Sequence, residues 1–350
     1  MKTLLDTTRV GGMALKNRFV AAAVGDFVAA GGHVTTRMRE KYETLARGGA
    51  GTIISGFTLV DEAEGAFPIA AMYADAFIEE YRGLTASVHA QGARMLQQLV
   101  YIGSYVMGET GGRPVLGPSA MANLNNGVVP KAMTGGEIRA VQGKFAQAAV
   151  RAKQAGFDGV ELHAAHGFLL SQFLTPYYNR RSDGYGGSAG KRARMVLETL
   201  AAVREAAGAD FPVWVKLNCT DGIEGGIAPE DFRQVCAALG QAGAAAIEVS
   251  GNWLDRAADK GPYFREEAAT IAGETAAAVV LTGGNRDFAQ LEELLNRTGI
   301  GYFGLARPLI AEPDLPLRYE RERPERARCV SCNACAQLEN AGSCILTRGA

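Results

Sequence analysis

Two of the four histidines in the chain stand three residues apart, directly after a short apolar run. His163 and His166 follow residues 157–162, which are typical of a buried strand. If the segment after the strand coils into a helical turn, this spacing places both imidazoles on one side. Such a pair can bind a carbonyl oxygen or an anion, or ligate a metal, but Glu161 is the only further ligand nearby. The pattern therefore favours carbonyl or anion binding over a metal site or two satisfied core residues.

Glycines and an arginine stand at the ends of two later apolar runs. The residues concerned are Gly283, Gly284, Asn285, Ala306 and Arg307. Glycines let backbone N–H groups approach an anion, and an arginine adds a bidentate charge partner. Loops after the seventh and eighth strands of a barrel often form a phosphate site. We therefore predict phosphate binding here, rather than two simple turns and a solvated arginine.

Two more polar side chains end apolar runs. Lys216 closes the run 212–217, so its ammonium points either into the protein or along the chain to solvent. A buried lysine is rare unless paired, and near a cofactor it would stabilise negative charge, which is the interpretation that we favour. Gln98 lies near the end of the run 94–99 and could offer a planar donor and acceptor to a ring edge.

Four of the six cysteines gather near the end of the chain. They are Cys329, Cys332, Cys335 and Cys344. In a reducing compartment this clustering indicates a metal rather than disulfides, and the C-x-x-C-x-x-C spacing favours a 4Fe-4S cluster over zinc, with free thiols as a third possibility. Cys219 and Cys236 stand alone in apolar segments and are predicted to be small buried hydrophobic residues.

Alternating strand-like and helix-like segments must position these residues. The predicted strands are 18–23, 51–55, 94–99, 160–162, 212–217, 245–249, 278–282 and 302–305. The predicted helices are 35–47, 74–90, 135–155, 192–207, 229–242, 268–276 and 286–296. Eight β-then-α units without a linker fit a single (β/α)8 TIM barrel of the α/β class better than a doubly wound sheet. Two long insertions, 101–130 and 250–264, would then lie on the carboxyl-end face and shape a pocket.

Composition sets the organisation and the class of partner. We expect a barrel over residues 1–320 and a short cysteine-rich, metal-binding extension over 321–350. A formal charge of −1 with evenly mixed charges predicts no nucleic-acid or anionic-membrane partner. The sequence shows neither the apolar core of a signal peptide nor a spanning run. We therefore expect a cytoplasmic homo-oligomer that acts on small molecules.

Several motifs together resemble the Old Yellow Enzyme family of FMN-dependent ene-reductases, over nearly the whole chain. The motifs are Leu15-Lys-Asn17-Arg18-Phe-Val, Gln98-Leu99, His163-x-x-His166-Gly, the segment from Gln172 to Gly187, and Ala306-Arg307-Pro. The C-terminal cysteines resemble the iron–sulfur branch of that family, which includes 2,4-dienoyl-CoA reductase and trimethylamine dehydrogenase.

The resemblance implies a role for each matching residue. Ala22, Ala23, Gln98 and Lys216 would hold the FMN ring, and Gly284, Ala306 and Arg307 its phosphate. His163 and His166 would bind the carbonyl oxygen of an α,β-unsaturated substrate, so that the flavin can deliver hydride to the β-carbon. The chain ends soon after the cysteines, so electrons are expected from NAD(P)H directly or from a separate reductase protein.

Three positions depart from the family pattern. Phe168 stands where a tyrosine commonly protonates the α-carbon, so either Tyr101, Tyr177, Tyr178 or water supplies that proton, or the reaction differs. Gly25, beside Asp26, replaces the usual flavin-tuning Thr or Cys, and Tyr101 stands where the family often has a histidine. Two other functions stay open: an electron-transfer subunit, and an amine-dehydrogenase-like oxidation, against which His163 speaks because those relatives carry tyrosine there.

Overall fold

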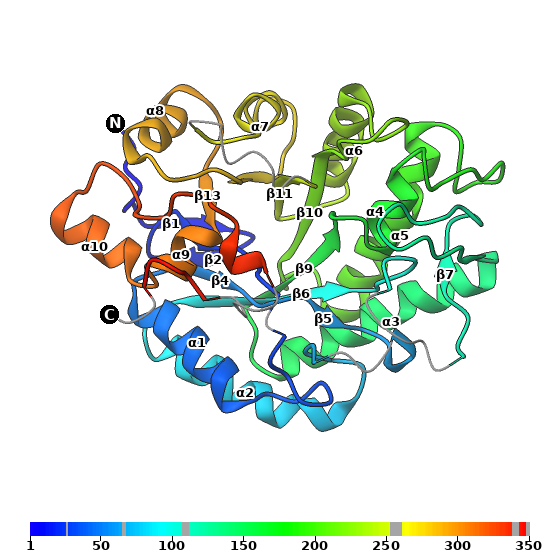
Figure 1. The fold of residues 1–350 in the computed structure, drawn as a ribbon, viewed down its shortest axis with the longest axis horizontal. Helices are drawn as coiled ribbons and strands as arrows, with labels where there is room; N and C mark the ends of the chain where they lie inside the picture. Colours follow the sequence, from blue (N-terminus) through cyan, green and yellow to red (C-terminus); the bar gives the residue numbers. More distant parts are fainter. Residues whose placement is uncertain (26, 65–67, 107–111, 253–260, 338–342, 348–350) are drawn as a thin grey trace.

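Parallel strands close into a barrel at the centre of the molecule, with helices around it (Figure 1). The computed structural model describes residues 1–350 except 26, 65–67, 107–111, 253–260, 338–342 and 348–350. The barrel strands of the described chain are β3 (Phe19–Ala21), β4 (Thr52–Ile54), β6 (Arg94–Val100), β9 (Gly159–Ala164), β10 (Val213–Thr220), β11 (Ala246–Gly251), β12 (Ala278–Thr282) and β13 (Tyr302–Leu305). They pair in this order, and β13 pairs with β3 to complete the ring. The predicted (β/α)8 barrel is confirmed.

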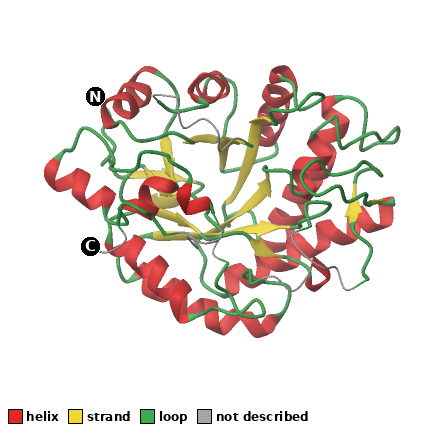
Figure 2. Cartoon of the chain, in the orientation of Figure 1, coloured by secondary structure: helices red, strands yellow, loops and turns green. Residues whose placement is uncertain are grey.

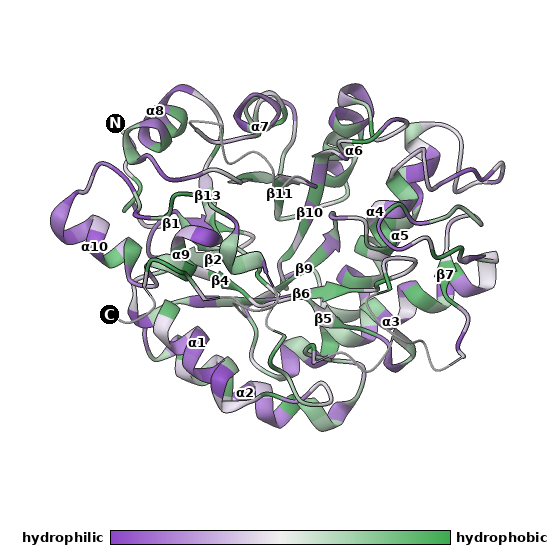
Figure 3. Cartoon of the chain, viewed as in Figure 1, coloured by the Kyte–Doolittle hydropathy of each residue, from purple (hydrophilic) through white to green (hydrophobic). Residues whose placement is uncertain are grey.

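The helices surround the ring, except for the short one after β13, which lies over the strands in this view (Figure 2). They are α1 (Thr36–Arg47), α2 (Ile78–His89), α3 (Gly135–Gln154), α4 (Leu169–Leu174), α5 (Ala189–Ala207), α6 (Pro229–Gln241), α7 (Arg265–Ala272), α8 (Phe288–Arg297), α9 (Arg307–Ala311) and α10 (Leu315–Glu322). Their outer faces are hydrophilic and the strands are largely hydrophobic (Figure 3), as expected for amphipathic helices on a buried parallel sheet.

Local sequence signals explain where several helices begin. Thr35 caps α1 by accepting a hydrogen bond from the Met38 amide, and Thr134 and Glu137 form a reciprocal capping box at α3. The predicted helix 268–276 instead begins at Arg265 and ends at Ala272. Glu266 and Glu267 in its first turn favour the earlier start through the helix dipole.

A hairpin that sequence patterning missed lies at the amino-terminal end of the barrel. It consists of β1 (Thr8–Val10) and β2 (Met13–Leu15), and its apolar side chains pack with those inside the barrel. The cluster contains Val10, Met13, Leu15, Val20, Ile54, Leu96, Trp214, Ala246, Val280 and Tyr302. This apolar layer therefore closes the amino-terminal end. Three short strands, β5 (Thr58–Leu59), β7 (Leu116–Gly117) and β8 (Lys131–Ala132), lie within connections between barrel elements.

A polar layer follows the apolar one along the inside of the barrel. Side chains two residues apart on a strand share a face, so the residues that follow Leu96, Trp214 and Ala246 by two positions also point inward. These residues are Gln98, Lys216 and Glu248, and Glu161 of β9 is in register with both Gln98 and Trp214. The carboxyl-end half of the barrel therefore carries buried polar groups.

The segment after α10 packs back onto the barrel. The Ala327 amide donates to the Arg286 carbonyl over 2.8 Å, and Asn333 accepts a hydrogen bond from Arg307 at the start of α9. Figure 1 shows the same arrangement, with the red C-terminal segment beside α9. The division into 1–320 and 321–350 stays a prediction. Within the described residues, no helix has the length and apolar character needed to cross a membrane.

Candidate active site

The two histidines meet at the carboxyl-end mouth of the barrel. His163 lies on β9 and is 3% exposed, while His166 lies in the turn after that strand. Their rings are 5.1 Å apart and nearly perpendicular, at 86°. The segment after β9 is not a helical turn, because His166 and Gly167 have left-handed backbone angles, with φ of 60° and 79°. A strand followed by a left-handed turn brings the rings together instead.

Two side chains that sequence reasoning missed hold His166 in this unusual conformation. The His166 amide donates to Asn218 Oδ1 over 3.1 Å, and His166 Nε2 lies 2.9 Å from Ser250 Oγ. Asn218 in turn donates to Asp221 Oδ1 over 2.9 Å. Asn218 and Ser250 each follow a polar inward residue by two positions, Lys216 and Glu248. This two-residue spacing of inward-facing polar residues is present in the sequence and could have indicated Asn218 and Ser250.

Both imidazoles are neutral at neutral pH. Burial, together with the Lys216 charge, lowers the pKa of His166 to about 3. Burial, His166 and Lys216 lower the pKa of His163 well below its usual value. Each neutral ring keeps one N–H that can be donated. His163 Nδ1 is buried and has no hydrogen-bond partner among the described residues, so a polar ligand at the mouth could satisfy it.

Lys216 lies inside the barrel and not at the surface. It is 2% exposed, and its Nζ donates to Glu248 Oε1 over 2.6 Å. Gln98 is 1% exposed and donates through Nε2 to Glu161 Oε1, also over 2.6 Å. The structure therefore brings Gln98 and Lys216 into one buried polar layer, each with a glutamate partner, and Lys216 is in register with His163.

The predicted phosphate loops lie side by side at the ends of β12 and β13. Gly283 and Gly284 have φ of 119° and 75°, which a side chain would strain. The Tyr263 amide donates to the Gly283 carbonyl, and the Tyr263 hydroxyl accepts from Arg307 over 3.2 Å. Arg307 is half-buried and held by this tyrosine, so it is not a freely solvated charge.

Asn285, which is also predicted to bind the cofactor, connects the ends of two neighbouring strands. Its Nδ2 donates to the carbonyls of Leu281 (2.6 Å) and Gly304 (2.9 Å), which ties the end of β12 to β13. Its Oδ1 is buried without a hydrogen-bond partner among the described residues. The carbonyl oxygen of the side chain is thus the part of Asn285 left for a ligand.

The ends of β3 and β13 border one cleft. This cleft has a volume of about 320 Å³, and Ala22 and Ala306 both line it. Ala23 directly follows Ala22 and is half-buried. Gly25 is close to two rings, because a Cβ built there would lie 2.6 Å from Phe27 and 2.9 Å from Phe57. Asp26 is outside the described residues.

An aromatic group flanks the histidine pair. The Phe168 ring lies 4.8 Å from the His163 ring, and Tyr105 lies 5.3 Å from Phe168. Tyr101 is 4% exposed, and its carbonyl accepts from the Leu169 amide of the histidine loop. Tyr178 is 7% exposed, and its hydroxyl accepts from the Leu124 amide. Burial raises the pKa of Tyr178, so its hydroxyl keeps its proton at neutral pH.

The four C-terminal cysteines do not form a ligand set in the described chain. All are free thiols; Cys332 is exposed and Cys329, Cys335 and Cys344 are half-buried. Burial and the Cys329 thiol raise the pKa of Cys335. Within the described ranges, however, no three His, Cys, Asp or Glu side chains are arranged to hold a metal. Cys219 and Cys236 are buried, as predicted.

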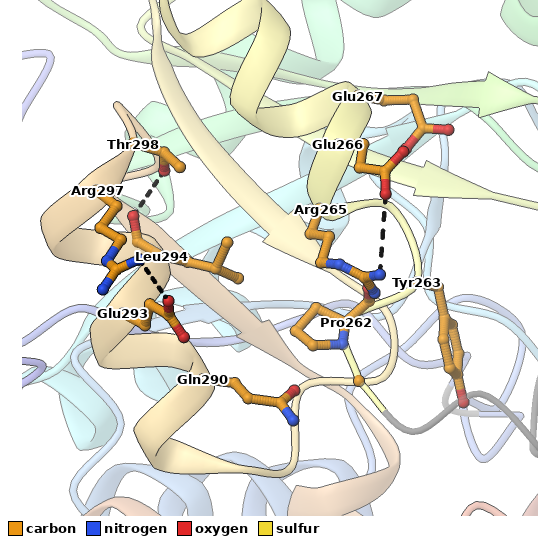
Figure 4. Close-up of a pocket in the computed structure, with 11 residues that line it drawn as sticks. Pro262, Tyr263, Arg265, Glu266, Glu267, Gln290, Glu293, Leu294, Arg297 and Thr298 are labelled. Carbon is orange, nitrogen blue, oxygen red and sulfur yellow. Dashed lines mark hydrogen bonds and ion pairs between the residues drawn. The ribbon is translucent and has the colours of Figure 1, made fainter.

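A groove of about 810 Å³ lies outside the barrel, between α7 and α8 (Figure 4). Its charges are largely matched within the groove: Arg297 pairs with Glu293 at 3.1 Å, and Arg265 lies 3.8 Å from Glu266. Two of its lining residues, Gly261 and Tyr263, also lie against the predicted phosphate loops: a Cβ built at Gly284 would lie 2.3 Å from the Gly261 carbonyl oxygen, and Arg307 donates to the Tyr263 hydroxyl. Because the charges of the groove pair with one another and the two histidines lie elsewhere, we place the chemistry at the barrel mouth and not in this groove.

Comparisons with known proteins identify the family of the chain. Residues 4–326 match the NADH:flavin oxidoreductase / NADH oxidase family. The chain is 34% identical over 342 residues to a metal reductase of Desulforamulus reducens, covering 95% of this chain and 51% of that protein. It is 29% identical over 365 residues to cinnamate reductase of Clostridium sporogenes, covering 95% and 55%. The chain thus spans about half the length of these curated relatives.

Solved structures of related enzymes have the same fold as this chain. A complex of 2-naphthoyl-CoA reductase with 2-naphthoyl-CoA superposes with a TM-score of 0.87 at 25% identity, covering 96% of this chain and 54% of that one. An old yellow enzyme homologue of Zymomonas mobilis superposes with a TM-score of 0.81 at 27% identity, covering 94% and 95%. The chain therefore belongs to the NADH:flavin oxidoreductase / NADH oxidase family, and old yellow enzyme homologues are among its structural neighbours.

Proposed function

We propose that the chain is an FMN-dependent ene-reductase that transfers hydride to the β-carbon of an α,β-unsaturated carbonyl compound. The observation that carries this proposal is the pair of neutral, buried histidines at the barrel mouth, where His163 is in register with the buried Lys216. The reductases named for cinnamate and 2-naphthoyl-CoA support it, because both names denote conjugated carbonyl compounds.

The residues at the mouth fit an FMN. Ala22, Ala23 and Gly25 would border its ring from β3, with Gln98 and Lys216 facing it from the barrel interior. Gly283, Gly284, Asn285, Ala306 and Arg307 would hold its phosphate end. Buried polar atoms without a described partner, His163 Nδ1 and Asn285 Oδ1, are consistent with a polar ligand that is bound here. When bound, FMN supplies the hydride chemistry, with NAD(P)H or a separate reductase as the electron donor.

The protein's own groups would activate and orient the substrate. His163 and His166 each donate one N–H to the carbonyl oxygen, which draws electron density from the C=C bond. Both stay neutral because their pKa values are depressed, so they act as hydrogen-bond donors and not as acids. Phe168 carries no proton to donate, and Tyr101 and Tyr178 are our candidates for the acid that protonates the α-carbon.

A paired substitution tests the role of the histidines. In His163→Ala combined with His166→Ala, we expect charge-transfer binding of phenols to disappear while FMN stays bound. Absorbance titration of the oxidised holoprotein measures both. Loss of FMN from the variant would mean that the pair is structural. A panel of enones added to anaerobically reduced wild-type protein then tests the reaction, because flavin that no enone reoxidises would rule out a reductase.

A second function rests on the cysteine spacing. A 4Fe-4S cluster on Cys329, Cys332, Cys335 and Cys344 would make the chain an electron-transfer subunit or link it to a partner reductase. The described side chains are not arranged as metal ligands, so the proposed reaction does not involve a cluster. Anaerobically purified protein should contain about four irons per chain if one cluster binds. Zinc without iron would refute the cluster, and zinc remains the alternative metal. Reoxidation by a partner flavoprotein, but by no enone, would favour electron transfer.

A further inference from the structure

Two glutamates and one lysine face one another in the polar layer. Glu161, Lys216 and Glu248 lie on the adjacent strands β9, β10 and β11, and Lys216 is in register with Glu248. Both glutamates are 0% exposed and the lysine is 2% exposed. All three ionisable groups are therefore removed from bulk water.

The hydrogen bonds leave one oxygen of each glutamate unused. Glu248 Oε1 accepts from Lys216 and Glu161 Oε1 accepts from Gln98, both over 2.6 Å. Glu161 Oε2 and Glu248 Oε2 are buried and accept no hydrogen bond from any described donor. Such oxygens are costly in a protein interior unless a proton or a donor reaches them.

The cluster of two glutamates and one lysine needs one more proton to be neutral. Two carboxylates and one ammonium would leave the dry interior with a net charge of −1. Among the residues that the structure describes, the other titratable groups that face this cluster are His163 and His166, and both are neutral, so they do not compensate for the charge. Gln98 of β6 and Thr282 of β12 complete the surroundings and carry no charge.

We propose that Glu161 and Glu248 share one proton, carried by Glu161, and that this pair is a proton-binding site in the barrel beneath the mouth. The Glu161 hydroxyl then donates to Glu248 Oε2, so one proton provides for both unused oxygens. The cluster of Glu161, Lys216 and Glu248 becomes neutral. Lys216 then has one negative partner, the Glu248 carboxylate, when a negatively charged ligand binds at the mouth. Glu161 acts as a positioning residue because its proton fixes the net charge around Lys216.

The electrostatic surroundings of the two glutamates agree with the assignment to Glu161. Burial and the Glu248 charge raise the pKa of Glu161 well above its usual value. Burial also acts on Glu248, but the charge of Lys216 and its hydrogen bond outweigh burial and lower the pKa of that carboxyl. The proton therefore resides on the glutamate that is not paired with lysine.

The stability of Glu161→Gln across pH tests the shared proton. Folding of the wild type takes up one proton at Glu161 above the ordinary glutamate pKa, whereas the variant takes up none there. The ratio of the wild-type to the variant unfolding constant should rise about tenfold per pH unit above about pH 5.5, as long as the pH stays below the raised pKa of Glu161 in the folded protein. Denaturant unfolding of the protein as purified measures it. Both proteins contain the histidines, so the contribution of histidine titration to the pH dependence of unfolding cancels in the ratio. Equal slopes would overturn the proposal.

A matched surface variant and a measurement on the wild type complete the test. Glu205→Gln removes an exposed carboxylate of α5 and should keep the wild-type slope. Infrared spectra of wild-type protein with isotope-labelled glutamate should show a protonated carboxyl band at neutral pH. This second measurement decides the question even if Glu161→Gln does not fold, because absence of the band would mean that both carboxylates are ionised. Neither readout depends on flavin chemistry, so the proposal can fail without the reductase function failing.

Discussion

The histidine pair combines burial with a neighbouring positive charge, and this combination fixes its protonation state. His163 is buried in the barrel mouth, and Lys216 disfavours a second positive charge close to it. The same two causes depress the pKa of His166 to about 3. The charged forms are therefore disfavoured in the folded protein, and below the ordinary histidine pKa the unfolded chain binds more protons. These two residues make stability fall as the pH falls through that range.

Binding of a carbonyl ligand should consequently be insensitive to histidine titration. We expect the dissociation constant of a non-ionising enone for the oxidised holoprotein to be constant between about pH 5 and pH 8, because both donors stay neutral. Flavin absorbance measures the binding. A step centred near the ordinary histidine pKa of about 6.5 would show that one of the rings ionises in this range.

At the scale of elements, the mouth depends on close contact between β12 and β13. Gly304 of β13 lies against Thr282 of β12, and a Cβ added at Gly304 would lie 1.8 Å from Thr282 Oγ1. Asn285 reinforces the same contact by donating to the Gly304 carbonyl. The glycine is therefore required by packing between neighbouring strands, next to the loops that we assign to phosphate.

Gly304→Ala should destabilise the protein by about 1–3 kcal/mol through overpacking. Adding Thr282→Ala removes the closest clashing atom and should recover part of that loss, which a double-mutant cycle in denaturant measures. Gly301 provides a matched control one residue before the same strand, since a Cβ there meets nothing nearer than 3.9 Å. Gly301→Ala should change stability by less than about 0.5 kcal/mol. Equal effects at both glycines would contradict the packing argument.

At the scale of the whole molecule, Asp158 joins elements at the end of the barrel opposite the mouth. It directly precedes β9 and accepts hydrogen bonds from His89 Nε2 (2.7 Å), Arg94 Nη1 (2.9 Å) and the Met95 amide (2.8 Å). Burial opposes ionisation, but these donors outweigh it and lower the pKa of Asp158. The carboxylate thereby holds α2, β6 and β9 together where the ring must close.

Asp158→Asn should lower the free energy of unfolding at neutral pH by about 2–3 kcal/mol, because charge-assisted hydrogen bonds are lost. The folded pKa is depressed, so the carboxylate stabilises the fold above the unfolded pKa of about 3.9, and this contribution disappears as the pH falls through the folded pKa. Denaturant unfolding at several pH values measures the difference, which should shrink in acid. Asp210→Asn, at a side chain 85% exposed, should have little effect at any pH.

Much of this organisation could be predicted from the sequence. The eight apolar runs gave the barrel, because buried parallel strands need continuous apolar segments separated by helices. The same runs predicted that four polar residues lie near one another, because the carboxyl ends of all strands in a barrel meet at one face. These residues are His163, His166, Lys216 and Arg307. The family roles of these residues, and the metal-binding tail, stay predictions.

Only the tertiary structure decided which side chains share a contact inside the barrel. A period of two shows which residues of one strand point inward, but not the register that pairs Lys216 with Glu248 on one side and with His163 on the other. The left-handed turn at His166 likewise depends on an acceptor 52 residues away, the Asn218 side chain. Local patterns set the elements, whereas contacts between distant strands set the charge and the geometry of the site.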